Sequence, residues 1–243
     1  SEVIYPNGRT ITYGYDGANR LLEVAHKLGR QLMAEFEYAL DELGNRTRKA
    51  ARLSVNAHSA MLEKTESYTY DALSQLVAVE EELRGRRLRR TAYTYDSAGN
   101  RTLLEEFRSN PHRGWVPAGA THYVHDAADR LLQAGNTAYT YDKNGNRLAE
   151  SGAGSRNAAY VYDAANRLIR VDFGRGPVAY IYDGDGNKVA RVEHDEAGVE
   201  STRILIDVAT ALPVVLHETG PRRDVTYLYG LSLISEEVVR PSW

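Results

Sequence analysis

The stretch YTYDSAGNR, at Tyr93–Arg101, decides the fold because nearly the same sequence recurs along the chain. It returns as YTYDKNGNR at Tyr139–Arg147 and as YVYDAANR at Tyr160–Arg167. A catalytic motif normally stands once per active site, whereas self-similarity at intervals of roughly 20–50 residues is typical of a repeat architecture. The recurrence therefore predicts a structural repeat.

Eight copies of a Tyr-x-Tyr-Asp motif align between residues 13 and 183. The first position is always tyrosine: Tyr13, Tyr38, Tyr68, Tyr93, Tyr123, Tyr139, Tyr160 and Tyr180. The fourth position is always aspartate: Asp16, Asp41, Asp71, Asp96, Asp126, Asp142, Asp163 and Asp183. The third position holds Tyr15, Tyr70, Tyr95, Tyr141, Tyr162 and Tyr182, with Leu40 and His125 as the two exceptions. Two degenerate copies, ILIDVATALP and YLYGLSLISEE, follow, as is usual near the boundary of an array.

The residues after the aspartate alternate between two patterns. In four copies a basic or amide residue stands four positions on: Arg20, Gln75, Arg130 and Arg167. In the other four a Gly-Asn pair leads to a basic residue five positions on: Gly44 and Arg46, Gly99 and Arg101, Gly145 and Arg147, Gly186 and Lys188. We interpret the patterns as two turn lengths that differ by one residue and set the strand register, since a one-residue slip moves every later side chain to the other face.

The motif has the chemistry of a strand followed by a tight turn. Side chains alternate along a strand, so Tyr-x-Tyr places two rings on one face. The aspartate can accept a hydrogen bond from the backbone two residues on, and Asn and Gly tolerate the positive φ of a hairpin. We expect the tyrosines of successive strands to bury one another.

We predict an all-β fold, an antiparallel hairpin-repeat ribbon in a single array over residues 1–243. Asp16 to Asp71 and Asp71 to Asp126 span 55 residues each, and the next double repeat spans 37. Residues 1–122 are thus two double repeats with a leading strand, 123–200 are compact repeats, and 201–243 are degenerate terminal repeats. The N-terminal stretch resembles the middle of a longer repetitive chain, so further repeats are expected upstream. Turns at the opposite strand ends are predicted at 28–31, 56–59, 85–87, 135–136, 174–177 and 196–198.

Composition excludes several classes of protein. The 243 residues carry a net charge of −3, which is unlike the strongly basic face of a nucleic-acid-binding protein. There is no cysteine, so disulfides and thiolate metal sites are excluded. No apolar run approaches the roughly 18 residues of a membrane span, and the N-terminus has no signal-peptide pattern.

Several residues of the chain allow a chemical as well as a structural interpretation. The aspartates suggest acid–base catalysis, but each stands where a turn needs a cap. The stretch Asp183-Gly-Asp185-Gly-Asn187 resembles a calcium loop but lacks its spacing and its terminal glutamate, so a turn is favoured. The histidines have no metal-ligand spacing, and His125 is expected to be a packed ring. For the basic run RGRRLRR at 84–90, pairing with Glu80–Glu82 on the facing strand is favoured over phosphate binding.

The tandem Tyr-x-Tyr-Asp turns resemble the YD-repeat, or Rhs-repeat, family over about Tyr5 to Glu237. This resemblance implies a β-ribbon that spirals into a hollow shell, of which this chain would form an open, partial segment. Family members include bacterial polymorphic toxins, the cocoon component of insecticidal toxin complexes, and the extracellular teneurins. In bacterial members the shell encloses a C-terminal toxic segment. The chain would then be the C-terminal part of a repeat shell, although it lacks the Asp-Pro-x-Gly segment at which many bacterial members release their cargo.

The resemblance implies a non-enzymatic scaffold that protects a cargo polypeptide before delivery. Its partners would be the upstream repeats, a C-terminal toxin segment and other toxin-complex subunits, with no cofactor, metal or nucleic acid. It implies a bacterial protein that is secreted, displayed on the cell surface or delivered by a secretion system. The alternative is a carbohydrate-binding or adhesion module, which would require tyrosine rings exposed on one face to stack on sugars.

Overall fold

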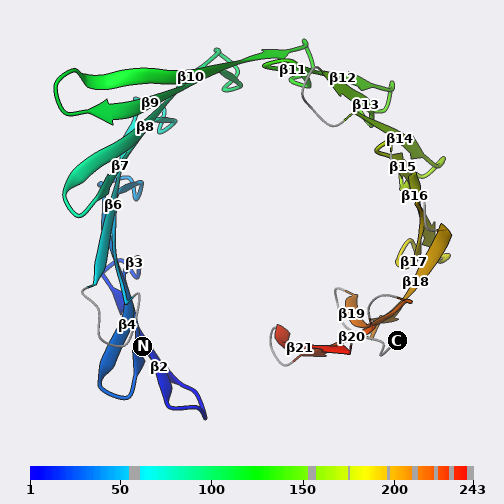
Figure 1. Cartoon of the computed structure of the whole chain (residues 1–243), viewed down its shortest axis with the longest axis horizontal. Coiled ribbons are helices and arrows are strands. Elements are labelled where there is room, and N and C mark those ends of the chain that lie inside the picture. Colours follow the sequence, from blue (N-terminus) through cyan, green and yellow to red (C-terminus); the bar gives the residue numbers. More distant parts are fainter. Residues whose placement is uncertain are drawn as a thin grey trace. The chain divides into compact units, whose positions relative to one another are not determined.

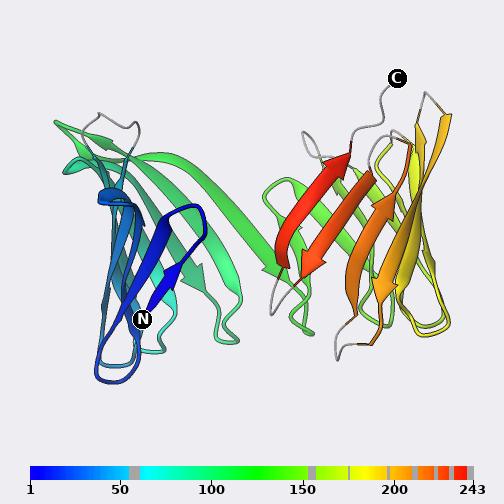
Figure 2. The same ribbon diagram turned by 90° about the horizontal axis from the view of Figure 1, so that it is seen from below.

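The computed structural model describes residues 1–54, 61–152, 157–174, 176–195, 198–209, 213–221, 224–229 and 233–239. All its regular elements in these ranges are β-strands, and the chain divides into two compact units, Ser1–His125 and Asp126–Trp243. Figures 1 and 2 show each unit as a single layer of strands joined by hairpins. The predicted all-β, antiparallel hairpin-repeat fold is confirmed.

Within each unit, strands that follow one another in sequence pair antiparallel. The first unit contains β1 (Glu2–Ile4), β2 (Arg9–Tyr15), β3 (Leu21–Leu28), β4 (Gln31–Leu40), β5 (Arg46–Leu53), β6 (Leu62–Tyr70), β7 (Leu76–Leu83), β8 (Arg86–Tyr95), β9 (Arg101–Asn110) and β10 (Gly114–His125). The second contains β11 (Leu131–Ala134), β12 (Thr137–Tyr141), β13 (Arg147–Gly152), β14 (Ala158–Tyr162), β15 (Leu168–Asp172), β16 (Pro177–Tyr182), β17 (Lys188–Asp195), β18 (Gly198–Asp207), β19 (Val214–Thr219), β20 (Asp224–Tyr229) and β21 (Leu233–Val239).

Every second connection is an aspartate turn, so these turns line one edge of each sheet. The opposite edge has turns at Gly29–Arg30 and Gly135–Asn136, as predicted, and at Arg84–Gly85, where the prediction of 85–87 began one residue late. The predicted turn at 56–59, and parts of those at 174–177 and 196–198, lie outside the described residues. The turn at 111–113, between β9 and β10, was not predicted, although Pro111 and Gly114 mark it in the sequence.

The prediction of two turn lengths is wrong, because all eight aspartate turns have the same length. In every copy the backbone N–H of the aspartate donates to the carbonyl four residues on, whether that residue is Arg20 or Asn45. The return strand always starts five residues after the aspartate, as Leu21 and Arg46 do. Seven of these turns also share a β-bulge at the sixth residue. The alternation therefore changes which side chains occupy three fixed positions, the third to the fifth residue after the aspartate, and leaves the strand register unchanged.

Burial is shallow because neither unit has a second layer. The buried apolar residues of the described chain are small: Ala25, Ala51, Ala78, Ala158, Val171 and Val225. The accessible surface of the chain is 16740 Å², against about 11,000 Å² expected for a compact monomer of this size. Much apolar surface thus stays in contact with solvent, and cohesion within each sheet rests largely on backbone pairing and on contacts between neighbouring side chains.

Candidate functional site: the aspartate-turn ladder

Each aspartate organises its turn with both carboxylate oxygens. In the first copy, Asp16 Oδ1 accepts the backbone N–H groups of Ala18 and Arg20, both at 2.9 Å. Asn19, three residues after Asp16, has a φ of +61°. The residue at this position has a positive φ in the other seven copies too: Gly44, Ser74, Gly99, Asp129, Gly145, Asn166 and Gly186. The predicted aspartate-capped turn is confirmed.

The second carboxylate oxygen, Oδ2, accepts a hydrogen bond from the side chain of the fourth residue after the aspartate. In the arginine-type turns the donor is Nε of Arg20 at 2.6 Å, Arg130 at 2.7 Å and Arg167 at 2.7 Å. In the asparagine-type turns it is Nδ2 of Asn45 at 2.9 Å, Asn100 at 3.2 Å, Asn146 at 2.9 Å and Asn187 at 3.0 Å. Arginine and asparagine at this position therefore have equivalent roles, which an alignment on charge alone conceals.

These hydrogen bonds lower the pKa of the aspartates and keep them ionised. The backbone N–H and the guanidinium of Arg20 lower the pKa of Asp16 below its ordinary 3.8. The side-chain amide of Asn45 lowers the pKa of Asp41 in the same way. The pKa is lowered also at Asp96, Asp126, Asp142, Asp163 and Asp183. A carboxylate with a lowered pKa holds no proton to donate at neutral pH and is a weak base. The arrangement suits a turn and is poorly suited to acid–base catalysis.

The same side chains join each turn to the next. Nη1 of an arginine-type turn donates to the backbone carbonyl of the following aspartate: Arg20 to Asp41 at 3.1 Å, Arg130 to Asp142 at 3.2 Å and Arg167 to Asp183 at 3.4 Å. Nδ2 of an asparagine-type turn reaches the following turn: Asn45 to Ser74 at 3.2 Å and Asn146 to Asn166 at 2.7 Å. We call these links, together with the turns, the aspartate-turn ladder. Along the sequence, links made by arginine therefore alternate with links made by asparagine.

Four tyrosines at the third motif position tie their hairpin to the preceding one. Their hydroxyls donate to the carbonyl of the first residue of the preceding return strand: Tyr70 to Arg46, Tyr95 to Leu76, Tyr141 to Leu131 and Tyr182 to Leu168, at 2.7–2.9 Å. Burial raises the pKa of Tyr95 and Tyr182, which keeps these donors protonated. His125 takes this position in the fifth copy, and its buried Nδ1 has no hydrogen-bond partner.

The tyrosines at the first motif position pack against basic side chains rather than against one another. In the asparagine-type copies the basic residue that opens the return strand lies over these rings: Arg46 over Tyr38 at 4.2 Å, Arg101 over Tyr123 at 4.7 Å, Arg147 over Tyr160 at 4.7 Å and Lys188 over Tyr180 at 5.4 Å. Among the described residues no two tyrosine rings form a stacked pair, and the rings of this position are half-buried. The prediction that tyrosines of successive strands bury one another is therefore wrong. These rings instead pack against arginine and lysine side chains.

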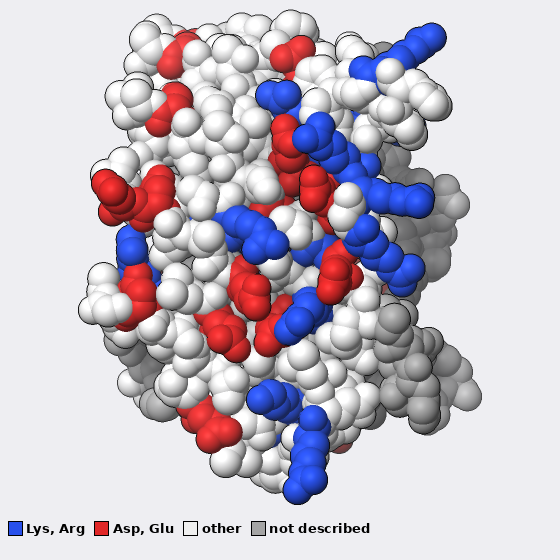
Figure 3. Space-filling view, turned by 90° about the vertical axis from the view of Figure 1, so that its left-hand side faces the viewer, with Lys and Arg blue, Asp and Glu red and all other residues white. Residues whose placement is uncertain are grey.

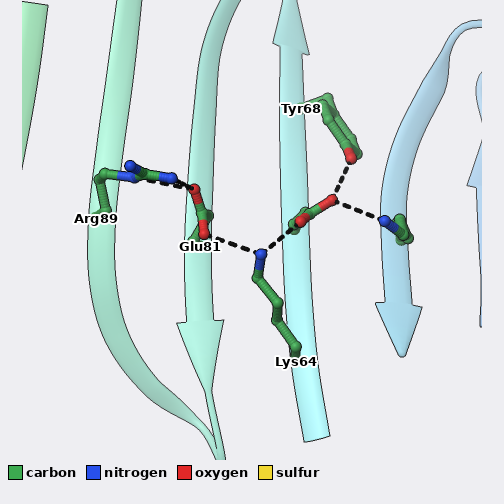
Figure 4. A network of polar contacts seen from close by, with 6 residues as sticks. Lys64, Tyr68, Glu81 and Arg89 are labelled. Carbon is green, nitrogen blue, oxygen red and sulfur yellow. Dashed lines mark hydrogen bonds and ion pairs between the residues drawn. The ribbon is translucent and has the colours of Figure 1, made fainter. Parts of the chain in front are cut away.

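A second polar cluster, which the sequence analysis did not find, crosses four strands of the first unit. Glu66 on β6 and Glu81 on β7 stand directly opposite each other, and Lys64 lies between them. Its Nζ is 2.7 Å from Glu66 and 3.0 Å from Glu81 (Figure 4). Lys49 and Tyr68 also contact Glu66, at 3.4 Å and 2.7 Å. Without Lys64 the two carboxylates would be a repulsive cross-strand pair.

The protonation of this cluster follows from its contacts. Burial by itself would raise the pKa of Glu66, but the hydrogen bonds from Lys64 and Tyr68 and the charge of Lys49 lower it to about 2. Burial likewise opposes the lowered pKa of Glu81, which results from Arg89 and Lys64. The cluster is therefore charged throughout at neutral pH, and its charges are compensated.

The basic run pairs with the facing acidic strand, as predicted. Arg89 donates from Nε and Nη2 to Glu81, at 3.0 Å and 2.5 Å. Arg90 lies 3.8 Å from Glu80, and Arg87 lies 3.9 Å from Glu82. Figure 3 shows acidic and basic side chains interspersed over this face of the first unit.

The alternative sites have little support in the described residues. No group of three or more His, Cys, Asp or Glu side chains there could hold a metal ion. Asp183, in the stretch that resembles a calcium loop, uses Oδ1 and Oδ2 to cap its turn through Asp185 and Asn187. Within the same ranges no helix has the length and apolarity to cross a membrane.

The comparisons with known proteins agree with this geometry. The chain is similar to a chain in the crystal structure of TcdB2-TccC3-TEV, with 14% identity over 97% of this chain and a TM-score of 0.52, which shows the fold. It also aligns with a chain of TcdB2-TccC3, at 14% identity over 92% of this chain with a TM-score of 0.47. It spans 15% of the length of each of these chains. No curated protein matches the sequence. The protein-family model described as Teneurin YD-shell matches residues 7–201, and the chain belongs to this YD-shell family.

Proposed function

We propose that the chain is a non-enzymatic wall segment of a larger YD shell, which encloses and protects a cargo polypeptide before delivery. The observation that carries this proposal is that the repeated side chains are committed to the sheet. The aspartates hold their turns, the arginines and asparagines join the turns, and the tyrosines bind backbone carbonyls or cations. Residues used in this way support a wall and are not free to act on a substrate.

The exposed surface supports the same proposal. The accessible area exceeds that of a compact monomer by roughly half, as expected for a sheet that is one layer thick. Within the described residues, β1 pairs only with β2 and β21 only with β20, which leaves one side of each strand open to further strands. We infer that neighbouring repeats of the same shell occupy these edges.

The similarity to the TcdB2-TccC3 fold supports a finer version of the proposal. In it, the chain is part of the repeat shell of an Rhs-type polymorphic toxin or of a toxin-complex cocoon. Its partners are a C-terminal toxic segment and other subunits of such a complex. We place this protein outside the cytoplasm of a bacterial producer, secreted, surface-displayed or delivered by a secretion system.

Limited proteolysis of the full protein expressed from its natural gene tests the proposal. Mass spectrometry would follow the polypeptide that is released when the shell is opened by acid. We expect this polypeptide to resist protease in the intact particle and to be digested rapidly once the particle opens. Equal digestion rates in the two states would rule out encapsulation.

The glycan-binding alternative has less support. Sugar stacking needs an open ring face, whereas the first-position tyrosines are half-buried and lie against arginine or lysine. A glycan array gives the deciding result. Saturable binding that is lost when the exposed Tyr5 and Tyr15 become alanine would support an adhesion module instead of a wall.

A further inference from the structure

The β7–β8 and β9–β10 hairpins end on either side of a groove, at the edge opposite the aspartate turns. The groove has a volume of about 720 Å³, within the range of about 300–1,000 Å³ of ordinary ligand sites. Gly85, Arg86 and Arg87 line one side, and Asn110 and Gly114 line the other. We call it the arginine groove.

The arginine groove lies among positive charges that the protein itself does not neutralise. The two hairpin tips, residues 82–87 and 108–115, hold one carboxylate, Glu82, and five arginines, Arg84, Arg86, Arg87, Arg108 and Arg113. Glu82 lies 3.9 Å from Arg87. In the described part of the chain, Arg84, Arg86 and Arg113 form no ion pair, and all three are exposed. A cationic cluster of this kind stands out in a chain whose net charge is −3.

The backbone holds two of these arginines in defined positions. Arg84 and Gly85 have φ values of +50° and +72°, so they form a two-residue turn in which Asn-Gly is the favoured sequence. Arg84 is the one described non-glycine residue with positive φ outside the aspartate turns. On the other hairpin, Asn110 Oδ1 accepts the N–H groups of His112 and Arg113 at 2.9 Å and 3.0 Å. Backbone strain of the kind at Arg84 is typically retained where a side chain has a function.

We propose that the arginine groove binds an extended, acidic polypeptide segment. A guanidinium presents paired donors that match a carboxylate. On β8, Arg89 already holds Glu81, with Nε and Nη2 both donating to Oε1. Gly85 and Gly114 leave open space where other residues would have a Cβ, so the backbone of a bound strand can approach closely. Glutamate or aspartate side chains of the segment would pair with Arg84, Arg86 and Arg113.

The aromatic surroundings favour a polypeptide over a sugar or a nucleic acid. Single-stranded nucleic acids bind through a basic groove combined with bases stacked on open aromatic faces, and glycans also stack on such faces. Trp115, on β10 near the groove, is half-buried and has the guanidinium of Arg87 lying 5.7 Å from its ring. Charge pairing with carboxylates is then the main source of binding energy.

Fluorescence anisotropy with fluorescein-labelled hexaglutamate tests the proposal on the full chain. The variant Arg84→Gln/Arg86→Gln/Arg113→Gln should weaken binding at least tenfold. The matched control Arg9→Gln/Arg30→Gln/Arg203→Gln removes the same charge from exposed arginines that have no ion pair among the described residues. It should change binding less than twofold. Equal losses in both variants, or tighter binding of oligo-deoxythymidine or heparin than of hexaglutamate, would overturn the proposal.

The single variant Arg84→Gly separates binding from folding. Glycine relieves the positive φ, so the urea midpoint should rise or stay unchanged while hexaglutamate binding weakens about threefold. Binding that is unchanged in this variant would also contradict the proposed role of Arg84.

Discussion

Arg20 joins two successive turns, because its Nε binds Asp16 at 2.6 Å and its Nη1 donates to the backbone carbonyl of Asp41 at 3.1 Å. The same connection recurs twice in the second unit, at Arg130 and Arg167. One side chain thus binds the aspartate of its own turn and the backbone of the next turn.

The first prediction concerns this link. Arg20→Gln should destabilise the chain by about 1–2 kcal/mol, because a charge-assisted hydrogen bond and a backbone acceptor lose their partner. Urea unfolding measures the change. Arg30→Gln is the matched control, since Arg30 lies exposed in a hairpin turn, and it should change stability by less than 0.5 kcal/mol, as is usual for surface substitutions. Similar losses in the two variants would show that charge alone, and not the link, stabilises the array.

The second prediction concerns the third residue after the aspartate. Gly99 has a φ of +90°, and the equivalent residues in other turns are Asn19 and Asn166. Gly99→Asn should therefore cost little, since the Cβ would meet only the flexible end of Gln75, at 3.2 Å. Gly99→Val should cost at least about 1–2 kcal/mol, because a β-branched residue disfavours this backbone conformation. Thermal unfolding of the pair gives the comparison, and equal stabilities would refute the common turn geometry.

The sequence predicted the strands and the aspartate turns because their signals are local. Tyr93, Tyr95 and Asp96 specify a strand face and a cap within four residues. The prediction of two turn lengths is wrong because charge aligns Arg20 with Arg46, whereas hydrogen bonding aligns Arg20 with Asn45. The fourth residue after each aspartate is arginine, asparagine or glutamine, and this shared ability to donate a hydrogen bond can be read from the sequence.

The side-chain clusters were harder to predict because they depend on register across several hairpins. Lys64, Glu66 and Glu81 meet only when β6 and β7 pair in one register. The contact of Arg147 with Tyr160 likewise joins two hairpins and depends on which face the bulged strand presents. Neither relationship has a signature in a short stretch of sequence.

The third prediction is a pH dependence. The pKa of Glu66 is about 2 in the folded chain, below its ordinary 4.5, so its charge stabilises the fold above about pH 4.5. This contribution is lost as the pH falls from 4.5 toward 2. Glu66→Gln should lower stability at pH 7 and should flatten the dependence over that range in urea titrations.

Glu42→Gln provides the control for this titration, since Glu42 is exposed in the second aspartate turn. It retains the acid sensitivity that the turn aspartates share, because their lowered pKa values also make the fold lose stability below about pH 3.8. If Glu66→Gln and Glu42→Gln give superimposable pH profiles, the Lys64–Glu66 cluster does not contribute as the geometry requires.

The fourth prediction repairs a defect in the repeat. His125 stands where Tyr70 and Tyr95 donate to a backbone carbonyl, and its buried Nδ1 has no partner. His125→Tyr should stabilise the chain by about 0.5–1.5 kcal/mol, since the hydroxyl would reach the carbonyl of Arg101 and the substitution would remove an unsatisfied polar atom.

Leu40→Tyr is the companion variant, with the carbonyl of Leu21 as its acceptor. Urea unfolding of both tyrosine variants is compared with that of His125→Phe and Leu40→Phe, which have the ring without the hydroxyl. The phenylalanine variants should give a smaller gain in stability. A gain as large with phenylalanine as with tyrosine would assign the third position to packing alone.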